Sequence, residues 1–186
     1  MSQRASGYAR QALDDYQTRA PWITEAVIRH FPRRPSCIWE PAAGEGFMVR
    51  ALRAAGFQVH STDINCPGNI DQNFLHFTLP PTTYIDAIVT NPPYSHATEF
   101  IEHALNLLPR RGFAAFLLRC DFDSAKTRQH LFGRRQSFWR KVVLVRRIQW
   151  FEHKIASPSY NHAWYIWYHS NKDFPTICYE PTEDYR

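Results

Sequence analysis

Short apolar runs alternate with amphipathic helical patterns along most of this chain, and this alternation constrains the fold more than any other feature. Runs rich in β-branched and other apolar residues predict short strands, the third of them weak, at 37–39, 58–63, 70–74, 85–89 and 113–118. Apolar residues at helical spacing predict helices at 22–31, 46–55 and 96–108. Such a pattern predicts an α/β fold in which a doubly wound, mostly parallel sheet carries helices on both faces.

Two further apolar runs follow a polar helix that we expect at about 124–139. They span 142–148 and 163–168 and are close enough in sequence to pair as antiparallel neighbours. With them the predicted sheet has seven strands and ends in an antiparallel C-terminal edge hairpin. Ligands of such sheets bind at the carboxyl ends of the strands, so the residues at those ends are the candidates for function.

The length of the chain predicts one domain. Its 186 residues, 44% of them hydrophobic, suffice for one well-buried core, which we place at 21–186. The polar stretch 1–20 is expected to be an N-terminal arm that is flexible unless it folds over a ligand. The sequence has no run of 18 apolar residues and no apolar core of a signal peptide, so we expect a cytoplasmic protein without membrane association.

Basic residues outnumber acidic ones by 22 to 17, and the resulting net charge of +5 favours a polyanionic partner. They concentrate at 133–147, where the alternatives are a solvated helix face followed by a strand, or contacts with phosphates. The four cysteines lack the paired spacing of a metal site or a disulfide framework. We therefore expect reduced, structural thiols and no bound metal.

The first predicted strand ends in the sequence EPAAGEG, residues 40–46. Gly44 and Gly46 let the backbone approach a ligand closely, and the helix that follows offers free amide groups. Carboxylates on both sides of Gly44 would repel a pyrophosphate but suit a ligand with a cationic amino or sulfonium group. Asp63, at the end of the next strand, stands where a ribose diol would be held. The alternative is a glycine turn that only closes a strand–helix unit.

The strand at 85–89 leads into Asn91, Pro92, Pro93 and Tyr94. Neither proline donates a backbone hydrogen bond, so the loop is stiff and its carbonyls are free to accept. The loop therefore favours a ligand that donates hydrogen bonds to these acceptors. The alternative is a structural turn with an asparagine cap and a buried tyrosine.

Together EPAAGEG and NPPY resemble the cofactor and catalytic loops of class I S-adenosylmethionine-dependent methyltransferases, and within them the enzymes that methylate the N6 amine of adenine in nucleic acids. The resemblance extends from about Tyr16 to Trp167. It implies a Rossmann-like methyltransferase fold, S-adenosylmethionine as cofactor, and catalysis by Asn91, Pro92 and Tyr94. The implied cofactor contacts of these two loops and of the second strand are Glu40, Ala42, Gly44, Gly46, Asp63 and Asn91.

Two further matches extend the implied cofactor site. The sequence NFL stands where such enzymes carry an Asp-Phe pair, so Asn73 would accept from the adenine amino group and Phe74 would pack on the ring, with Asp71 as a rival acceptor. The sequence YQTRAPW is similar to a Tyr-x-Thr-Pro-x-Trp segment that closes over the cofactor in some of these enzymes. It implies contacts from Tyr16 and Thr18, and a plain helix-capping turn is the alternative.

The aromatic stretch 150–167 lies between the last two predicted strands. By the same resemblance it borders the pocket for the target base, and the implied substrate contacts are Pro93, Tyr94, Phe151, Lys154, Pro158 and Tyr160. The alternative is a core hairpin, which we expect for Trp164 and Ile166. We expect His153 and His162 to be structural, because the implied chemistry needs no base.

The function that follows from the resemblance is methyl transfer to adenine N6, in DNA rather than RNA. We expect a short or relaxed sequence preference, because no gap between predicted elements holds a separate target-recognition domain, and a monomer or small homo-oligomer. The alternatives are an RNA adenine methyltransferase, a release-factor-type glutamine methyltransferase, and a non-catalytic nucleic-acid-binding module on the same fold.

Overall fold

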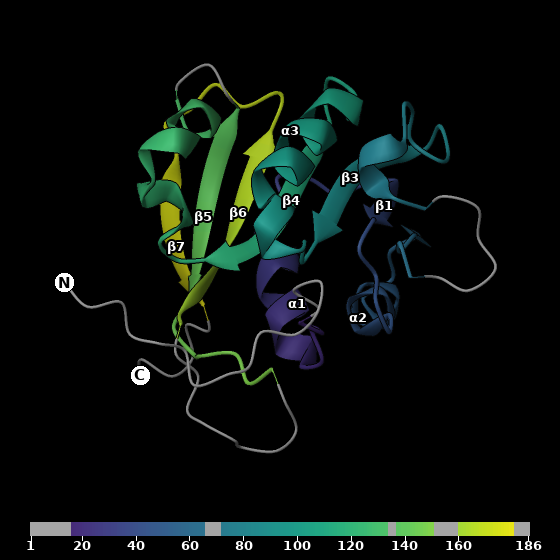
Figure 1. Cartoon of the computed structure of the whole chain (residues 1–186), viewed down its shortest axis with the longest axis horizontal. Helices are drawn as coiled ribbons and strands as arrows, with labels where there is room; N and C mark the ends of the chain where they lie inside the picture. Colours follow the sequence, from purple (N-terminus) through teal and green to yellow (C-terminus); the bar gives the residue numbers. More distant parts are fainter. Residues whose placement is uncertain (1–15, 66–71, 134–136, 151–159, 181–186) are drawn as a thin grey trace.

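The computed structural model describes residues 16–65, 72–133, 137–150 and 160–180, and its centre is a seven-stranded sheet (Figure 1). The strand order is β2-β1-β3-β4-β6-β5-β7. The strands are β1 (Cys37–Glu40), β2 (Val59–Ser61), β3 (Ile85–Thr90), β4 (Phe113–Arg119), β5 (Phe138–Leu144), β6 (His162–Tyr168) and β7 (Thr176–Glu180). The α-helices of the described ranges are α1 (Pro21–Ile28), α2 (Phe47–Ala54) and α3 (Ala97–Leu107). None of these helices has the length and apolar character that crossing a membrane requires.

The sheet is mostly parallel, as the sequence predicts. β1 pairs in parallel with β2 and β3, and β3 pairs in parallel with β4. β6 runs antiparallel to both of its neighbours, β4 and β5, while β7 is parallel to β5. The predicted antiparallel hairpin is therefore confirmed as β5 and β6, and β7 adds an edge strand beyond it.

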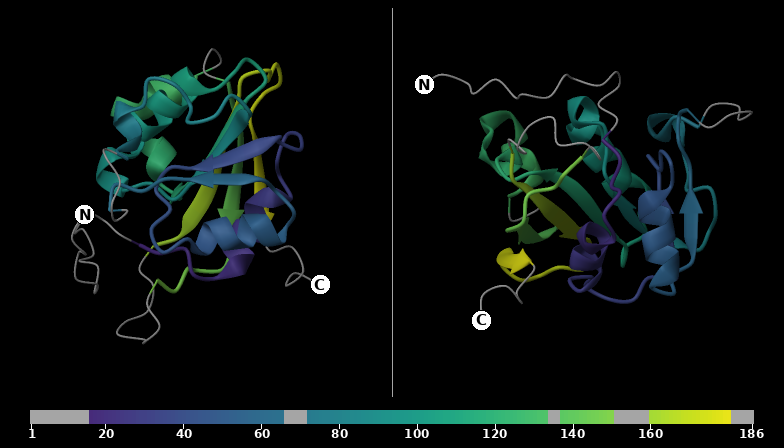
Figure 2. Two further views of the ribbon diagram at one scale, coloured as in Figure 1. Left: turned by 90° about the vertical axis from the view of Figure 1, so that its right-hand side faces the viewer. Right: turned by 90° about the horizontal axis from the view of Figure 1, so that it is seen from below.

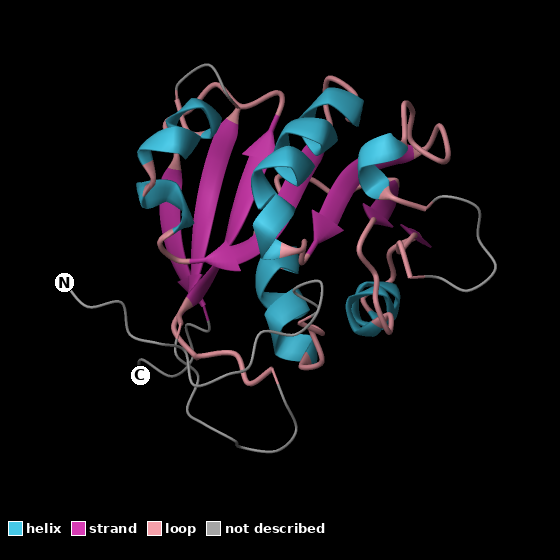
Figure 3. Cartoon of the chain, in the orientation of Figure 1, coloured by secondary structure: helices cyan, strands magenta, loops and turns pink. Residues whose placement is uncertain are grey.

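Helices cover both faces of the sheet. Figure 2 shows α1 and α2 on one side of the strands, and Figure 3 shows α3 lying across the opposite side. Val27 of α1 and Leu52 of α2 share one core cluster with Ile166, and Ile101 of α3 shares the other with Phe116. The two clusters confirm the predicted doubly wound architecture.

Strand β4 shows why the sequence folds in this way. Its first six residues, FAAFLL, are all buried. The even-numbered ones belong to the core cluster under α3, and the odd-numbered ones belong to the cluster under α1 and α2. Because successive side chains of a strand point to opposite faces, a strand that is covered on both faces must be apolar throughout.

The prediction of a strand at 70–74 is wrong for 72–74, the part of this range that the structure describes. Asn73 instead caps a short 3-10 helix, η2 (Phe74–His76), because its side-chain oxygen accepts a hydrogen bond from Leu75 N at 3.1 Å. Such a local bond between side chain and backbone competes with strand pairing. The predicted helix at 22–31 is confirmed as α1, but it ends three residues early, at Ile28.

The polar helix expected at 124–139 is also wrong. In its place the described residues form two short 3-10 helices, η4 (Phe122–Ser124) and η5 (Lys126–Leu131). Strand β5 already begins at Phe138, although charged residues interrupt its apolar pattern. The strand tolerates Lys141 because its ammonium donates to Asp123 Oδ2 at 2.7 Å.

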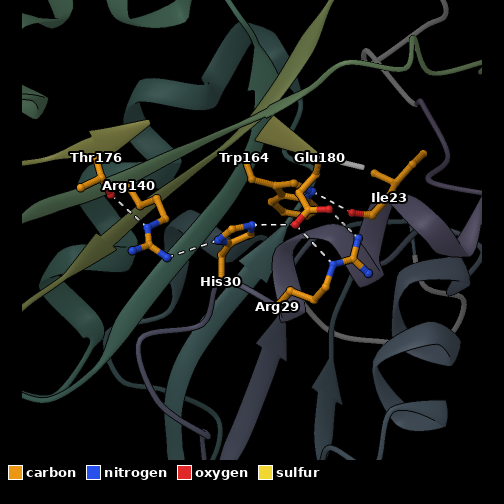
Figure 4. Close-up of polar contacts among 7 residues, drawn as sticks. All are labelled: Ile23, Arg29, His30, Arg140, Trp164, Thr176 and Glu180. Carbon is orange, nitrogen blue, oxygen red and sulfur yellow. Dashed lines mark hydrogen bonds and ion pairs between the residues drawn. The ribbon is translucent and has the colours of Figure 1, made fainter. Parts of the chain in front are cut away.

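Strand β7 was not predicted, and a buried carboxylate ties it to α1 (Figure 4). Glu180, the last residue of β7, accepts from Arg29 Nη2 at 2.8 Å and from His30 Nε2 at 2.9 Å. Arg140 on β5 donates to His30 Nδ1 at 3.2 Å, so the imidazole carries its proton on Nε2. The edge strand is thereby held to the residues that directly follow α1.

Candidate active site

Polar side chains gather at the carboxyl ends of β1, β2 and β3, as their parallel pairing requires. Glu40 ends β1, Asp63 follows β2 by two residues, and Asn91 directly follows β3. All three line one cavity of about 290 Å³. The residues predicted from the sequence that line it are Tyr16, Thr18, Glu40, Ala42, Asp63, Asn73, Phe74, Asn91 and Pro93.

Glu40 is buried, with 1% of its surface exposed. Its Oε1 accepts hydrogen bonds from Thr90 Oγ1 at 2.6 Å and from Ala42 N at 3.1 Å. Its Oε2 is buried and has no hydrogen-bond partner among the described residues. Burial raises the pKa of Glu40 to about 8, so the carboxyl is protonated at neutral pH unless a cation enters the cavity.

The loop between β1 and α2 uses the conformations that its glycines permit. Gly44 has a φ of +49°, and Gly46, which caps α2, has a φ of +77°. Gly44 N donates to Asp63 Oδ2 at 2.7 Å, which fixes this loop against the end of β2. A Cβ at Gly44 would lie 2.4 Å from Gln17 Nε2, so glycine is also needed for the close approach of Gln17. The two glycines shape the site without lining its cavity.

Asn73 and Phe74, the residues predicted to bind the adenine of the cofactor, also make contacts within the protein. Asn73 Oδ1 accepts from Leu75 N, and the ring of Phe74 packs edge-on against Trp39 at 5.0 Å between centroids. Ile64 lines the same cavity and is 64% exposed, although we did not single it out in the sequence. The sequence signal for Ile64 is its position directly after Asp63, the predicted ribose contact.

Asn91 is oriented by the N-terminal segment. Its Nδ2 donates to the main-chain oxygen of Tyr16 at 2.6 Å. Since a carbonyl oxygen only accepts, this contact fixes which end of the amide faces Tyr16. The other end, Asn91 Oδ1, is buried and has no hydrogen-bond partner in the described part of the chain.

Tyr94 borders a second cavity and belongs to an aromatic cluster. Its ring stacks with Tyr16 at 5.9 Å and with His162 at 6.0 Å between centroids. Trp150 completes the cluster, at 5.6 Å from Tyr16 and 5.1 Å from His162. Burial and the nearby Arg119 lower the pKa of His162 to about 4, so the ring is neutral. Trp150, at the start of the aromatic stretch 150–167, was not among the residues predicted from the sequence.

The structure describes only some of the remaining residues that the sequence analysis named. Pro92 is buried, and Tyr160 lies under the Arg119 guanidinium, with 3.8 Å from Cζ to the ring centroid. Phe151, Lys154 and Pro158 lie outside the described residues, as do Asp71 and His153.

Cations of the basic stretch 133–147 hold the fold together. Arg140 and Lys141 have the partners named above, and Arg147 Nε donates to Asn161 Oδ1 at 3.0 Å. Residues 134–136 lie outside the described ranges. These three cations thus make contacts within the fold, and the described part of the stretch forms strand β5 rather than the predicted helix face.

The residues around the first cavity fit S-adenosylmethionine. Its described lining includes the carboxyls of Glu40 and Asp63 and contains neither lysine nor arginine. The unpartnered oxygen of Glu40 suits a cationic ligand, and Asp63 suits ribose hydroxyls. Over the described ranges, no group of three His, Cys, Asp or Glu side chains is arranged to hold a metal ion.

The sheet topology and the likeness to solved structures show that the chain has the Rossmann-like α/β fold of class I methyltransferases. It is similar to a putative class I S-adenosylmethionine-dependent methyltransferase from Listeria monocytogenes, with a TM-score of 0.60 and 11% identity over 92% of this chain and 68% of that one. No protein-family model and no curated protein matches the chain.

Two restriction–modification proteins share the fold. One is a modification subunit of a putative type I restriction enzyme from Vibrio vulnificus YJ016, with a TM-score of 0.56 and 17% identity over 89% of this chain. The other is a chain of a type I restriction–modification system, with a TM-score of 0.59 and 15% identity over 93% of this chain. This chain spans 46% of the length of each. At these identities the likeness establishes the fold alone.

Proposed function

We propose that this protein transfers a methyl group from S-adenosylmethionine to the exocyclic N6 amine of adenine in nucleic acid, with DNA preferred over RNA. The observation that carries the proposal is Asn91 Oδ1, a buried acceptor without a partner among the described residues, at the wall of the cavity that contains Glu40 and Asp63. A buried acceptor is costly to leave unsatisfied, which favours a ligand that brings N–H groups to it.

The chain would act mainly by positioning the amine. S-adenosylmethionine, when bound, would supply an activated methyl group to the amine nitrogen, with its sulfur leaving as a neutral thioether and the amine proton going to water. Asn91 Oδ1 and the Pro92 carbonyl would accept the two N–H groups, turn the nitrogen lone pair out of conjugation and stabilise the charge that develops. The ring of Tyr94, with Pro93 beside it, would hold the base after it leaves the stack.

The cofactor would be held across the loops that follow the first three strands. Glu40 would ionise opposite the cationic methionine part, and Asp63 would accept from the ribose hydroxyls. Asn73, Phe74 and Ile64 would border the adenine. Tyr16 and Thr18, from the segment before α1, would close the cavity.

DNA is the preferred substrate in this proposal because two proteins with the same fold belong to type I restriction–modification systems. The net charge of +5 suits a polyanion of either kind, DNA or RNA. A short or relaxed sequence preference remains our expectation.

Incubation with methyl-labelled S-adenosylmethionine tests the proposal. Duplex DNA, single-stranded DNA, RNA and a release factor are offered separately, and the label in each is counted. We expect label in DNA, more than in RNA, and within adenine. Label in the release factor alone would refute the nucleic-acid assignment. Cofactor binding without transfer to any substrate would instead support the non-catalytic alternative.

A further inference from the structure

A second cavity, of about 270 Å³, borders the catalytic loop at Tyr94. Arg119, the last residue of β4, places it at the same edge of the sheet as the cofactor cavity. Its other polar lining consists of Asp121 and Arg128, and Phe122 forms part of its apolar wall. The function proposed above assigns no role to these four residues.

Arg119 contributes little net charge to this cavity. Its Nε donates to Asp121 Oδ1 at 3.0 Å, and its Nη2 pairs with the other carboxylate oxygen. The guanidinium also covers the ring of Tyr160. The ion pair is neutral overall and holds Arg119 in one orientation.

Arg128 supplies the excess positive charge of the cavity. Its guanidinium lies over the ring of Phe122, with 4.1 Å from Cζ to the centroid. Its Nε is buried and has no hydrogen-bond partner among the described residues. A guanidinium that stacks on a ring keeps its N–H edge available, so Arg128 offers an oriented donor without an acceptor.

We infer that the second cavity binds a phosphodiester of the strand that carries the target base, and that Arg128 contacts its oxygens. The inference rests on the proposed function, because Tyr94 is the residue expected to stack on that base. The sugar and phosphate of a base held there must lie close to the same ring. Phosphate oxygens match the fork of a guanidinium, and the ion pair with Arg119 offsets the repulsion from Asp121.

The salt dependence of nucleic-acid binding tests this inference. Equilibrium binding of an adenine-containing oligonucleotide is measured at several salt concentrations between about 50 and about 200 mM. Arg128→Gln should make the slope of log K against log salt shallower by roughly 0.7 to 0.9, the value expected for one lost phosphate contact. Affinity at low salt should fall by about tenfold, with cofactor affinity unchanged.

Arg110→Gln is the matched control, because Arg110 is exposed and precedes β4 at the opposite end of the strand. It removes the same charge and should leave the slope unchanged. Arg128→Lys keeps the charge and should retain the slope, which separates loss of the contact from loss of folding. An unchanged slope in Arg128→Gln, with methyl transfer intact, would overturn this inference alone. Absence of nucleic-acid binding by the unaltered protein would overturn the proposed function with it.

Discussion

The main-chain oxygen of Tyr16 lies 2.6 Å from Asn91 Nδ2 and thereby sets the orientation of the Asn91 amide. The contact joins the segment before α1 to the loop after β3, which are 75 residues apart in sequence. With Nδ2 engaged, Oδ1 is the atom left for a ligand. The nature of residue 91 should therefore matter for stability as well as for chemistry.

Asn91→Asp replaces a donor by an acceptor opposite the Tyr16 carbonyl. Repulsion between the two oxygens should lower the free energy of unfolding by about 1–3 kcal/mol at pH 8. The loss should shrink at pH 4, near the ordinary aspartate pKa of about 3.9, because a protonated carboxyl is able to donate. Urea unfolding at both pH values measures this, with exposed Asn106→Asp as control. Equal losses at the two pH values would contradict the assigned orientation.

Cofactor binding should be coupled to the ionisation of Glu40. Burial raises the pKa of Glu40 to about 8, so below this pH the free protein holds a proton that a cationic ligand displaces. Affinity for S-adenosylmethionine should rise as the pH increases toward 8 and then level off. Calorimetry in two buffers of different ionisation enthalpy should show proton release at pH 7. Glu40→Gln should abolish this release, and a wild-type protein that releases no proton would count against the coupling.

His162 should make the fold sensitive to acid. Burial and Arg119 lower the pKa of His162 to about 4, below its ordinary value of 6.5. The unfolded chain therefore binds a proton that the folded chain does not, and stability present above pH 6.5 is lost as the pH falls toward 4. At roughly 1.4 kcal/mol per pKa unit, the loss is up to about 3 kcal/mol. His162→Phe should show a smaller loss over this range in urea unfolding; an identical loss would exclude His162 as its source.

Glu180 should stabilise the edge strand more than a surface carboxylate does. Burial opposes ionisation, but the hydrogen bonds from Arg29 and His30 outweigh it and lower the pKa of Glu180. Glu180→Ala should reduce the free energy of unfolding by about 2–3 kcal/mol, because charged hydrogen bonds are lost from a buried site.

Glu102 provides the matched control for this prediction. It also pairs with a histidine, His130, at 2.7 Å, but its side chain is 50% exposed against 7% for Glu180. Glu102→Ala should cost less than about 1 kcal/mol, as exposed ion pairs do. Similar losses for the two variants in denaturant unfolding would show that β7 is not anchored through Glu180.

The sequence predicted the carboxyl edge of the sheet well because the information there is local. A buried apolar strand followed by a polar residue identifies Glu40, Asp63 and Asn91 one at a time, and the parallel order then brings them together. The apolar pattern predicted the wrong element where a side chain competes with the backbone for hydrogen bonds. At Asn73 the side chain caps a 3-10 helix in place of the predicted strand.

Long-range contacts account for what sequence reasoning missed. The carbonyl of Tyr16 on Asn91 is a main-chain contact that no pattern of side chains encodes. Tyr16 and His162, which pack against Trp150, come from segments far apart in the sequence. β7 depends on pairing with β5 and on the distant Arg29 and His30, so its short sequence gave little local signal.

Turnover by Asn91→Ala tests the central claim most directly. The unaltered protein and the variant are incubated with S-adenosylmethionine and DNA, and the nucleosides are analysed by mass spectrometry. We predict N6-methyldeoxyadenosine from the unaltered protein and at least about 100-fold less from the variant, the size of effect seen when an oriented electrostatic partner is removed. Cofactor affinity should change by less than about threefold, because the variant keeps Glu40 and Asp63, which are proposed to hold the cofactor. Equal amounts of methylated adenine from both proteins, or none from the unaltered one, would contradict the account.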